Sequence, residues 1–255
     1  RVGEREAGFS MELWAENMGA YTVGFISPTG EVAREISVPL RGENTVSFLL
    51  EQTQITVYTQ IADVSSGSQF IFMRFENPMS GIWRILIRNS LDIRETFHIW
   101  LPVRGFITDE TYFLRPDPDT IITDPGNARY PITVTAYDHT KNSIYIHASR
   151  GYSLSGRIKP DLAAPGVNIL GASVSGRRLT RMSGTSVSAA HLAGAAAILL
   201  NWGVLNANYP YLNTPVLKSI FVRGAQRNPA LTYPNREFGY GTLNLYEAFL
   251  HLRNL

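Results

Sequence analysis

The spacing of hydrophobic and polar positions divides the chain into a β-type part and a mixed part. Up to residue 105, short runs of alternating apolar and polar residues recur every ten to twelve residues, separated by turn-forming stretches such as 27–30 and 77–81. This spacing is typical of an all-β sandwich, for which we expect a jelly-roll form. The predicted strands are residues 9–16, 21–27, 32–38, 45–50, 54–59, 69–76, 82–88 and 96–101.

After a proline-rich stretch at residues 115–119, the pattern changes to strands alternating with helices. Such alternation predicts an α/β layer. The chain is therefore expected to form two domains, residues 1–115 and residues 116–255. The elements predicted in the second domain are strands at 132–136 and 167–170 and helices at 186–201, 214–223 and 245–252.

The distribution of charge supports this division, and the composition excludes several classes of function. Residues 1–105 hold 9 Arg, no Lys and 12 acidic residues, a net charge of −3, whereas the remainder has a net charge of +5. With a total of +2 and no basic block, the chain is not expected to bind nucleic acid. The absence of cysteine excludes disulfides, zinc ribbons and thiol nucleophiles. The longest apolar stretch, residues 189–202, is interrupted by His191 and Asn201, so no membrane association is expected.

One segment has the residue pattern of a nucleophilic site. Gly184, Thr185 and Ser186 precede an Ala- and Gly-rich stretch, which places Ser186 in the first turn of the predicted helix. Free N–H groups and the positive end of the helix dipole can stabilise an oxyanion at that position, as catalysis by a serine nucleophile requires. Taken alone, the same pattern also fits an ordinary helix N-cap. It departs from the Gly-x-Ser-x-Gly elbow at Ser188.

The surrounding motifs resemble the C-terminal half of the subtilisin-like serine proteases, or subtilases. The family's Gly-Thr-Ser and Ala-Pro-Gly motifs match at residues 184–186 and 164–166, the latter within Lys-Pro-Asp-Leu-Ala-Ala-Pro-Gly. Phe-Gly-Tyr-Gly-Thr-Leu-Asn at 238–244 is similar to the family's closing segment, and Asp-Pro-Gly-Asn-Ala at 124–128 to one wall of its specificity pocket. The resemblance covers about residues 118–255 and implies an α/β subtilisin-like fold there.

The resemblance also implies roles for individual residues. Ser186 would be the catalytic nucleophile, and its own backbone N–H would donate to the oxyanion. His191 coincides with a family histidine that packs and hydrogen-bonds within this helix rather than acting in catalysis. The residues implied in substrate binding are Thr123, Asp124, Gly126, Gly184 and Thr185.

The other members of a subtilisin triad have no match in this sequence. In subtilisin, the Asp and the His precede the Ser in the chain, but neither a His-Gly-Thr nor an Asp-Ser/Thr-Gly motif occurs here. The oxyanion Asn would also lie upstream. We therefore expect the C-terminal portion of an endopeptidase, inactive as this chain alone. Its partners would be a peptide or protein substrate and the remaining N-terminal part of the protease. The alternative is a catalytically dead pseudoprotease that acts as a binding or regulatory partner.

A sandwich placed ahead of the specificity-pocket strand resembles the Csp-type germination proteases of spore-forming bacteria. Phe-His-Ile-Trp-Leu-Pro at 97–102 and Ser-Arg-Gly at 149–151 are similar to segments of that subgroup. An extracytoplasmic or spore-associated location, and possible calcium binding, are implied by resemblance only; the residues themselves identify no metal site or cofactor. A different hypothesis makes the sandwich a carbohydrate-binding module with an aromatic face, for which Trp14, Trp83 and Trp100 are candidates.

Overall fold

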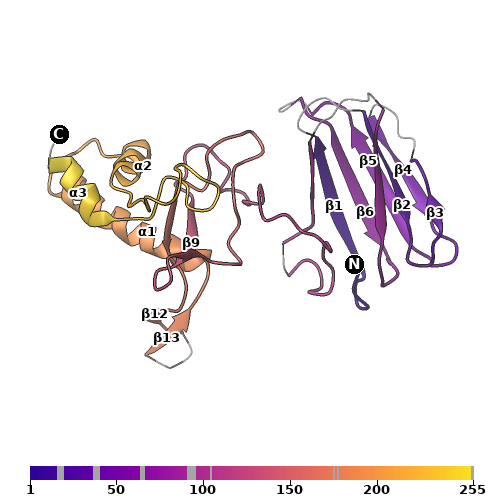
Figure 1. Cartoon of the computed structure of the whole chain (residues 1–255), viewed down its shortest axis with the longest axis horizontal. Coiled ribbons are helices and arrows are strands. Elements are labelled where there is room, and N and C mark those ends of the chain that lie inside the picture. Colours follow the sequence, from indigo (N-terminus) through magenta and orange to yellow (C-terminus); the bar gives the residue numbers. More distant parts are fainter. Residues whose placement is uncertain are drawn as a thin grey trace. The chain divides into compact units, whose positions relative to one another are not determined.

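The chain divides into two compact units, Arg1–Pro116 and Asp117–Leu255. Their structure is a computed structural model, shown in Figure 1, which describes residues 1–15, 20–36, 41–63, 67–90, 96–103, 105–174, 176 and 178–253. The first unit is built from strands, whereas the second combines strands and helices. The boundary predicted after residue 115 lies one residue from this division.

The N-terminal unit is a sandwich of two antiparallel sheets. One sheet has five strands in the order β4–β5–β6–β1–β8, and the other has three in the order β3–β2–β7. The strands are β1 Gly8–Ala15, β2 Tyr21–Ile26, β3 Val32–Ala33, β4 Arg41–Ser47, β5 Gln54–Gln60, β6 Phe70–Glu76, β7 Arg84–Asn89 and β8 Phe97–Trp100. A two-sheet sandwich is thus present, and its specific jelly-roll form stays a prediction.

The alternating pattern of the strands packs one core between the two sheets. Leu13 of β1 and Met73 of β6 point inward and are fully buried, as expected for a sheet with one covered face. Phe25 of β2 meets Phe75 of β6 edge to face, with ring centroids 5.5 Å apart. Because these rings belong to opposite sheets, the contact joins the two sheets through their apolar faces.

Two predicted strands differ from the observed ones at the sheet edge. The third shortens to Val32–Ala33, and the residues 37 and 38 predicted to continue it lie outside the described residues. The fourth begins earlier than expected and ends at Ser47; Leu49 and Leu50, which were predicted to belong to it, lie in the turn before β5 and are 85% and 76% exposed. Strand β4 is an edge strand with polar side chains on both faces, so it lacks the hydrophobic alternation by which strands are predicted.

The three tryptophans proposed for sugar binding lie in different environments. Trp14 and Trp100 lie on the outer face of the five-stranded sheet, since their neighbours along β1 and β8 point into the core. Trp14 packs against Phe70, with ring centroids 4.5 Å apart. Trp83 instead packs edge to face on the core residue Phe75 at 5.8 Å. The carbohydrate-binding hypothesis therefore depends on Trp14 and Trp100, and Trp83 is a packing residue.

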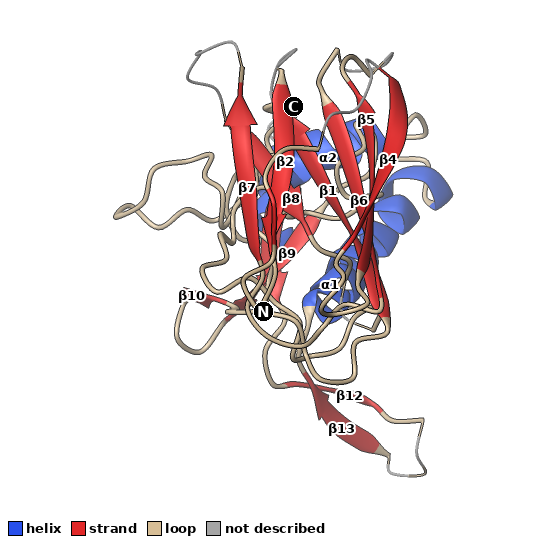
Figure 2. Cartoon of the chain, turned by 90° about the vertical axis from the view of Figure 1, so that its right-hand side faces the viewer, coloured by secondary structure: helices blue, strands red, loops and turns tan. Residues whose placement is uncertain are grey.

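The C-terminal unit packs helices on a small sheet. Strand β9 (Val134–Asp138) pairs in parallel with β11 (Leu162–Pro165) and antiparallel with β10 (Ser143–Ile144). Helix α1 contacts both β9 and β11, and α2 contacts α3. The β12–β13 hairpin projects away from these elements in both views (Figures 1 and 2). The remaining elements are β12 Ile169–Ala172, β13 Leu179–Met182, α1 Thr185–Leu200, a π-helical turn at Asn201–Leu205, α2 Thr214–Arg223 and α3 Leu245–Arg253.

In the C-terminal unit, the helices agree closely with the sequence-based expectations, whereas the strands are shifted along the chain or missed. Strand β11 was not predicted, although Leu162, Ala163 and Ala164 are completely buried. It lies beneath α1 and beside residues 241–243. The Ala163 N–H donates to Gly241 O at 2.9 Å. A strand covered in this way contains small side chains and no polar alternation, so periodicity gives no signal for it. The strand predicted at 167–170 is found two residues later, as β12, and pairs with β13.

Candidate active site

Ser186 lies exposed in the first turn of α1, at the point where the sequence predicts a nucleophile. Gly184 is the N-cap residue, with a φ of 152° that side chains disfavour. It caps the helix without a side-chain hydrogen bond, and the first turn contains no acidic residue. The Ser186 N–H belongs to the first-turn groups that have no acceptor within the helix. An anion beside Ser186 would therefore meet a free N–H and the positive end of the helix dipole.

The residues before Ser186 are attached to the loop that follows β11. Gly184 N donates to Gly166 O at 2.8 Å, and Asn168 N donates to Ser183 Oγ at 2.9 Å. Gly166 N in turn donates to Tyr137 O near the end of β9 at 3.1 Å. The position of the nucleophile turn is thus set by the carboxyl ends of the two parallel strands.

The predicted substrate-binding residues near position 123 form a separate turn. Gly126 N donates to Thr123 O at 2.8 Å, and Thr133 Oγ1 donates to Gly126 O at 2.6 Å. A Cβ at Gly126 would lie 2.9 Å from Thr123 O, so this turn requires glycine. Thr123 and Asp124 are exposed.

The two groups of predicted site residues are attached to opposite ends of the β9–β11 pair. Thr133 immediately precedes β9, whereas Gly166 follows the end of β11 and bonds to Tyr137. The four residue-to-residue steps from Thr133 to Tyr137 span roughly 13 Å along an extended strand. The turn containing Thr123 and Gly126 is therefore fixed at a distance from the nucleophile turn, and Gly184 and Thr185 are the predicted binding residues adjacent to Ser186.

A buried ion cluster joins the starts of β9 and β11. Lys159 and Asp161, only 1% and 0% exposed, pair at 2.9 Å, and Asp161 also pairs with Lys218 of α2. The Lys159 ammonium donates to Pro131 O at 2.8 Å and to Thr133 Oγ1 at 2.9 Å. Burial lowers the pKa of Lys159, whereas the hydrogen bond to Asp161 and its negative charge act in the opposite direction.

This cluster supports the turn that contains Gly126. The bond from Lys159 to Thr133 continues through Thr133 Oγ1 to Gly126 O. The sequence motifs do not predict this cluster. The sequence gives one signal for it: two charged residues, Lys159 and Asp161, stand within the otherwise apolar segment 159–166.

The ring of His191, the histidine closest in sequence to Ser186, contacts the backbone of its own helix. Its Nδ1 lies 3.1 Å from Val187 O, one turn back along α1, and the side chain is exposed.

Within the described residues, no three side chains of His, Cys, Asp or Glu gather as a metal site requires. These described residues therefore offer no carboxylate cluster for calcium.

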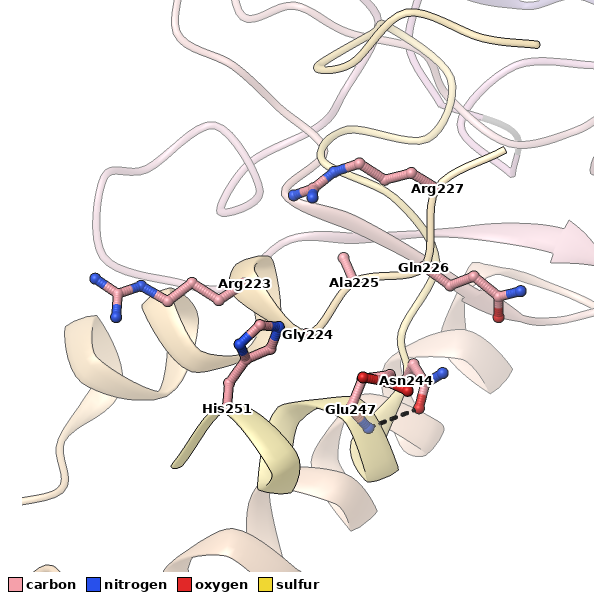
Figure 3. Close-up of a pocket in the computed structure, with 8 residues that line it drawn as sticks. All are labelled: Arg223, Gly224, Ala225, Gln226, Arg227, Asn244, Glu247 and His251. Carbon is pink, nitrogen blue, oxygen red and sulfur yellow. Dashed lines mark hydrogen bonds between the residues drawn. The ribbon is translucent and has the colours of Figure 1, made fainter. Parts of the chain in front are cut away.

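A pocket of about 450 Å³ lies elsewhere in the C-terminal unit, at the ends of α2 and α3 (Figure 3). Asn244 Oδ1 accepts the Glu247 N–H at 3.1 Å and caps α3. None of the predicted site residues lines this pocket, so it is not the candidate active site. Its lining residues are Arg223, Gly224, Ala225, Gln226, Arg227, Asn244, Glu247 and His251.

Helix α1 has an apolar face that the C-terminal unit does not cover. Leu192 and Leu199 are buried in the core, but Ile198 is 53% exposed, and Leu205 at the end of the π-helical turn is 79% exposed. By length and composition alone, the helix from Thr185 to Leu205 could cross a membrane. The expected absence of membrane association therefore stays a prediction.

Comparison with known proteins identifies the family of the C-terminal unit. Residues 115–241 match the model of the subtilase family, Peptidase S8. Subtilisin-like protease 1 of Pseudogymnoascus destructans is 33% identical over 106 residues, 41% of this chain and 24% of its own length. The serine protease AprX of Bacillus subtilis is 35% identical over 104 residues, 33% of this chain and 23% of its own length. The chain thus spans about a quarter of the length of these curated relatives.

The solved structure of the Clostridium perfringens CspB protease is similar to both units. It matches with a TM-score of 0.88 and 29% sequence identity, covering 100% of this chain and 54% of CspB. The match therefore includes the sandwich as well as the α/β unit. The chain belongs to the subtilase family through its C-terminal unit, and the match to CspB supports the Csp-type subgroup that its sequence resembles.

Proposed function

We propose that this chain is the nucleophile-bearing portion of a subtilisin-like serine endopeptidase. The observation that supports this most directly is the exposed Ser186 in a first helical turn without a side-chain cap. Thr123, Asp124, Gly126, Gly184 and Thr185 are the residues that we propose for substrate binding.

The proposed reaction is acyl transfer to Ser186 followed by hydrolysis. Ser186 Oγ attacks the peptide carbonyl carbon while a histidine takes the hydroxyl proton, and the Ser186 N–H donates to the resulting oxyanion. The tetrahedral intermediate then expels the amine, which receives the proton from that histidine. Water attacks the acyl-enzyme by the same route and releases the acid, restoring the Ser186 hydroxyl.

The histidine, its aspartate and a further oxyanion donor would come from a remaining N-terminal part of the protease. Two observations favour this arrangement. The match to CspB covers all of this chain, whereas it covers only 54% of the CspB chain. In addition, α1 exposes apolar side chains such as Ile198, which a subtilase partner segment would cover. On this proposal, the occupant of the exposed face is protein rather than lipid.

Labelling with a fluorophosphonate tests the proposal. The full-length protease is expected to be labelled at Ser186, identified by mass spectrometry of the labelled peptide, and Ser186→Ala is expected to remove the label. The 255-residue chain alone should not be labelled at an appreciable rate, because loss of the subtilisin triad costs about 10⁶ in rate.

The same experiment distinguishes the alternatives. Rapid peptide hydrolysis by the isolated chain would contradict the requirement for an N-terminal part. A folded full-length protein that binds peptides but is not labelled would instead favour the pseudoprotease hypothesis, in which the same fold serves as a binding or regulatory partner.

A further inference from the structure

We infer that Ser188 is a positioning residue that fixes the nucleophile turn against the end of strand β11. This inference rests on the proposed function, because it concerns how Ser186 is held. Ser188 lies two residues after the nucleophile in α1 and is completely buried, whereas Ser186 is exposed. The two serines therefore lie in different environments of the same helical turn.

The Ser188 hydroxyl bonds outside its own helix. Its Oγ is 2.9 Å from Ala164 O and 3.2 Å from Pro165 O, the last two residues of β11. A serine in a helix commonly donates to a carbonyl one turn back in the same helix. Here the hydroxyl joins α1 to a strand that lies more than twenty residues earlier in the sequence.

A second contact joins the same two segments from the other side. Gly184 N donates to Gly166 O at 2.8 Å, so hydrogen bonds on both sides of Ser186 end on consecutive residues of one corner, 164–166. A Cβ at Gly166 would lie 2.3 Å from Ser188 Oγ and 2.9 Å from Gly184 O. The corner and the helical turn are thus in direct contact, with no space for an added methyl group.

This arrangement restrains the backbone that carries the two atoms of Ser186 that the reaction uses. Ser186 lies between Gly184 and Ser188 along the chain, so restraints at both positions limit the rotation of the first turn. That rotation would move the Ser186 N–H and Oγ relative to a bound carbonyl. Because displacement of a reacting group by about 1 Å can cost a hundredfold in rate, loss of one restraint is expected to lower kcat. The KM should change little, since the buried Ser188 hydroxyl bonds to the chain itself and cannot contact substrate.

The first test compares Ser188→Ala with Ser188→Cys in the full-length protease. We expect Ser188→Ala to lower kcat about tenfold. It should also lower, by a similar factor, the affinity for a peptide boronic acid, which forms a tetrahedral adduct with the catalytic serine. Ser188→Cys keeps a weak hydrogen-bond donor at the same position, so it should restore part of the loss.

The control is Ser153→Ala in the same unit. Ser153 is also buried, at 7% exposure, and its Oγ accepts from Arg157 N at 2.9 Å. This variant should lose thermal stability with little change in kcat or boronic acid affinity. If Ser188→Ala also changes only the melting temperature, the hydroxyl has a structural role and the inference is wrong.

The second test does not depend on proteolysis. Amide hydrogen exchange is measured on the 255-residue chain and on its Ser188→Ala variant, at a temperature where both are folded. We expect at least tenfold faster exchange in residues 184–188, with little change in α2. Unchanged exchange in this turn would overturn the inference. If the wild-type full-length protein is not labelled at Ser186 but the exchange result is as expected, then the protease proposal fails while the restraint by Ser188 stands.

Discussion

At the scale of single residues, the buried ion cluster is a feature of the C-terminal unit that is costly to disturb. Lys159 and Asp161 are almost completely inaccessible to solvent, so removing one partner leaves an uncompensated charge in a medium that solvates it poorly. The pair in turn supports Thr133, and through it the turn at Gly126. The stability of this unit should therefore be unusually sensitive to substitution at one carboxylate.

We predict that Asp161→Asn destabilises the C-terminal unit by about 3–5 kcal/mol, because Lys159 stays buried without its counter-charge. The matched control is Asp119→Asn, which removes an ion pair with Arg236 whose side chains are 31% and 50% exposed. That pair should contribute less than about 1 kcal/mol. Urea unfolding followed by circular dichroism measures both values. If both substitutions lowered the free energy of unfolding equally, burial of the Lys159–Asp161 pair would not explain the loss of stability.

Glu6 gives the N-terminal unit a pH-dependent contribution to stability. Burial raises the pKa of Glu6, but hydrogen bonds from the Thr108 N–H and from the Thr108 and Thr111 hydroxyls outweigh it and hold the pKa below its usual 4.5. A carboxylate with a depressed pKa stabilises the fold above its unfolded-state pKa, and this contribution disappears as the pH falls through the folded-state pKa.

We therefore predict that Glu6→Gln lowers the melting temperature at pH 7 and reduces its further fall between pH 5 and pH 3. The exposed Glu43 provides the control, and Glu43→Gln should leave the acid-induced fall in melting temperature close to that of the wild type. Differential scanning fluorimetry across this pH range measures both. A Glu6→Gln curve parallel to the wild-type curve would mean that the hydrogen bonds at Glu6 contribute nothing that depends on its charge.

At the scale of elements, α1 has two apolar faces in different environments. Leu199 is completely buried in the core, whereas its neighbour Ile198 is 53% exposed. A helix with apolar residues around its circumference normally lies inside a protein. The amino-acid sequence of α1 is thus suited to burial on more sides than the described part of the chain provides.

We predict opposite outcomes for adjacent substitutions in the 255-residue chain. Leu199→Ala should cost about 2–5 kcal/mol because it removes a buried side chain and leaves a cavity. Ile198→Ala should change stability by less than about 1 kcal/mol, since it removes exposed surface from a helix in which Ala is favourable. Urea denaturation of both variants is the measurement. A large loss of stability in Ile198→Ala would show that this face is already covered within the chain.

At the scale of the whole molecule, the same substitution tests the proposed partner of α1. If the remaining N-terminal part of the protease covers this face, Ile198→Ala should cost about 2–4 kcal/mol in the full-length protein while remaining neutral in the 255-residue chain. The comparison uses chemical denaturation of both proteins under the same conditions. A neutral result in both would remove the main structural support for an N-terminal segment packed on α1.

The extent to which sequence patterns predict this molecule depends on the kind of element. The amphipathic helix Thr214–Arg223 is found at the residues predicted, because its periodicity reflects one buried face. Strand β11 and edge strand β4 were missed or misplaced, because one is covered on all sides and the other is polar on both faces. In neither case does the sequence contain the alternation that a half-buried strand requires.

The sequence alone determined the family resemblance, the two-part organisation and the position of Ser186, because motifs, turn residues and helix starts are local features of the chain. The tertiary structure decided which residues surround the nucleophile turn. Ser188 and the corner 164–166 meet there, and Lys159, Asp161 and Lys218 come together at the other end of β11. These contacts join residues distant in sequence, and each depends on burial and on distances that only the folded chain sets.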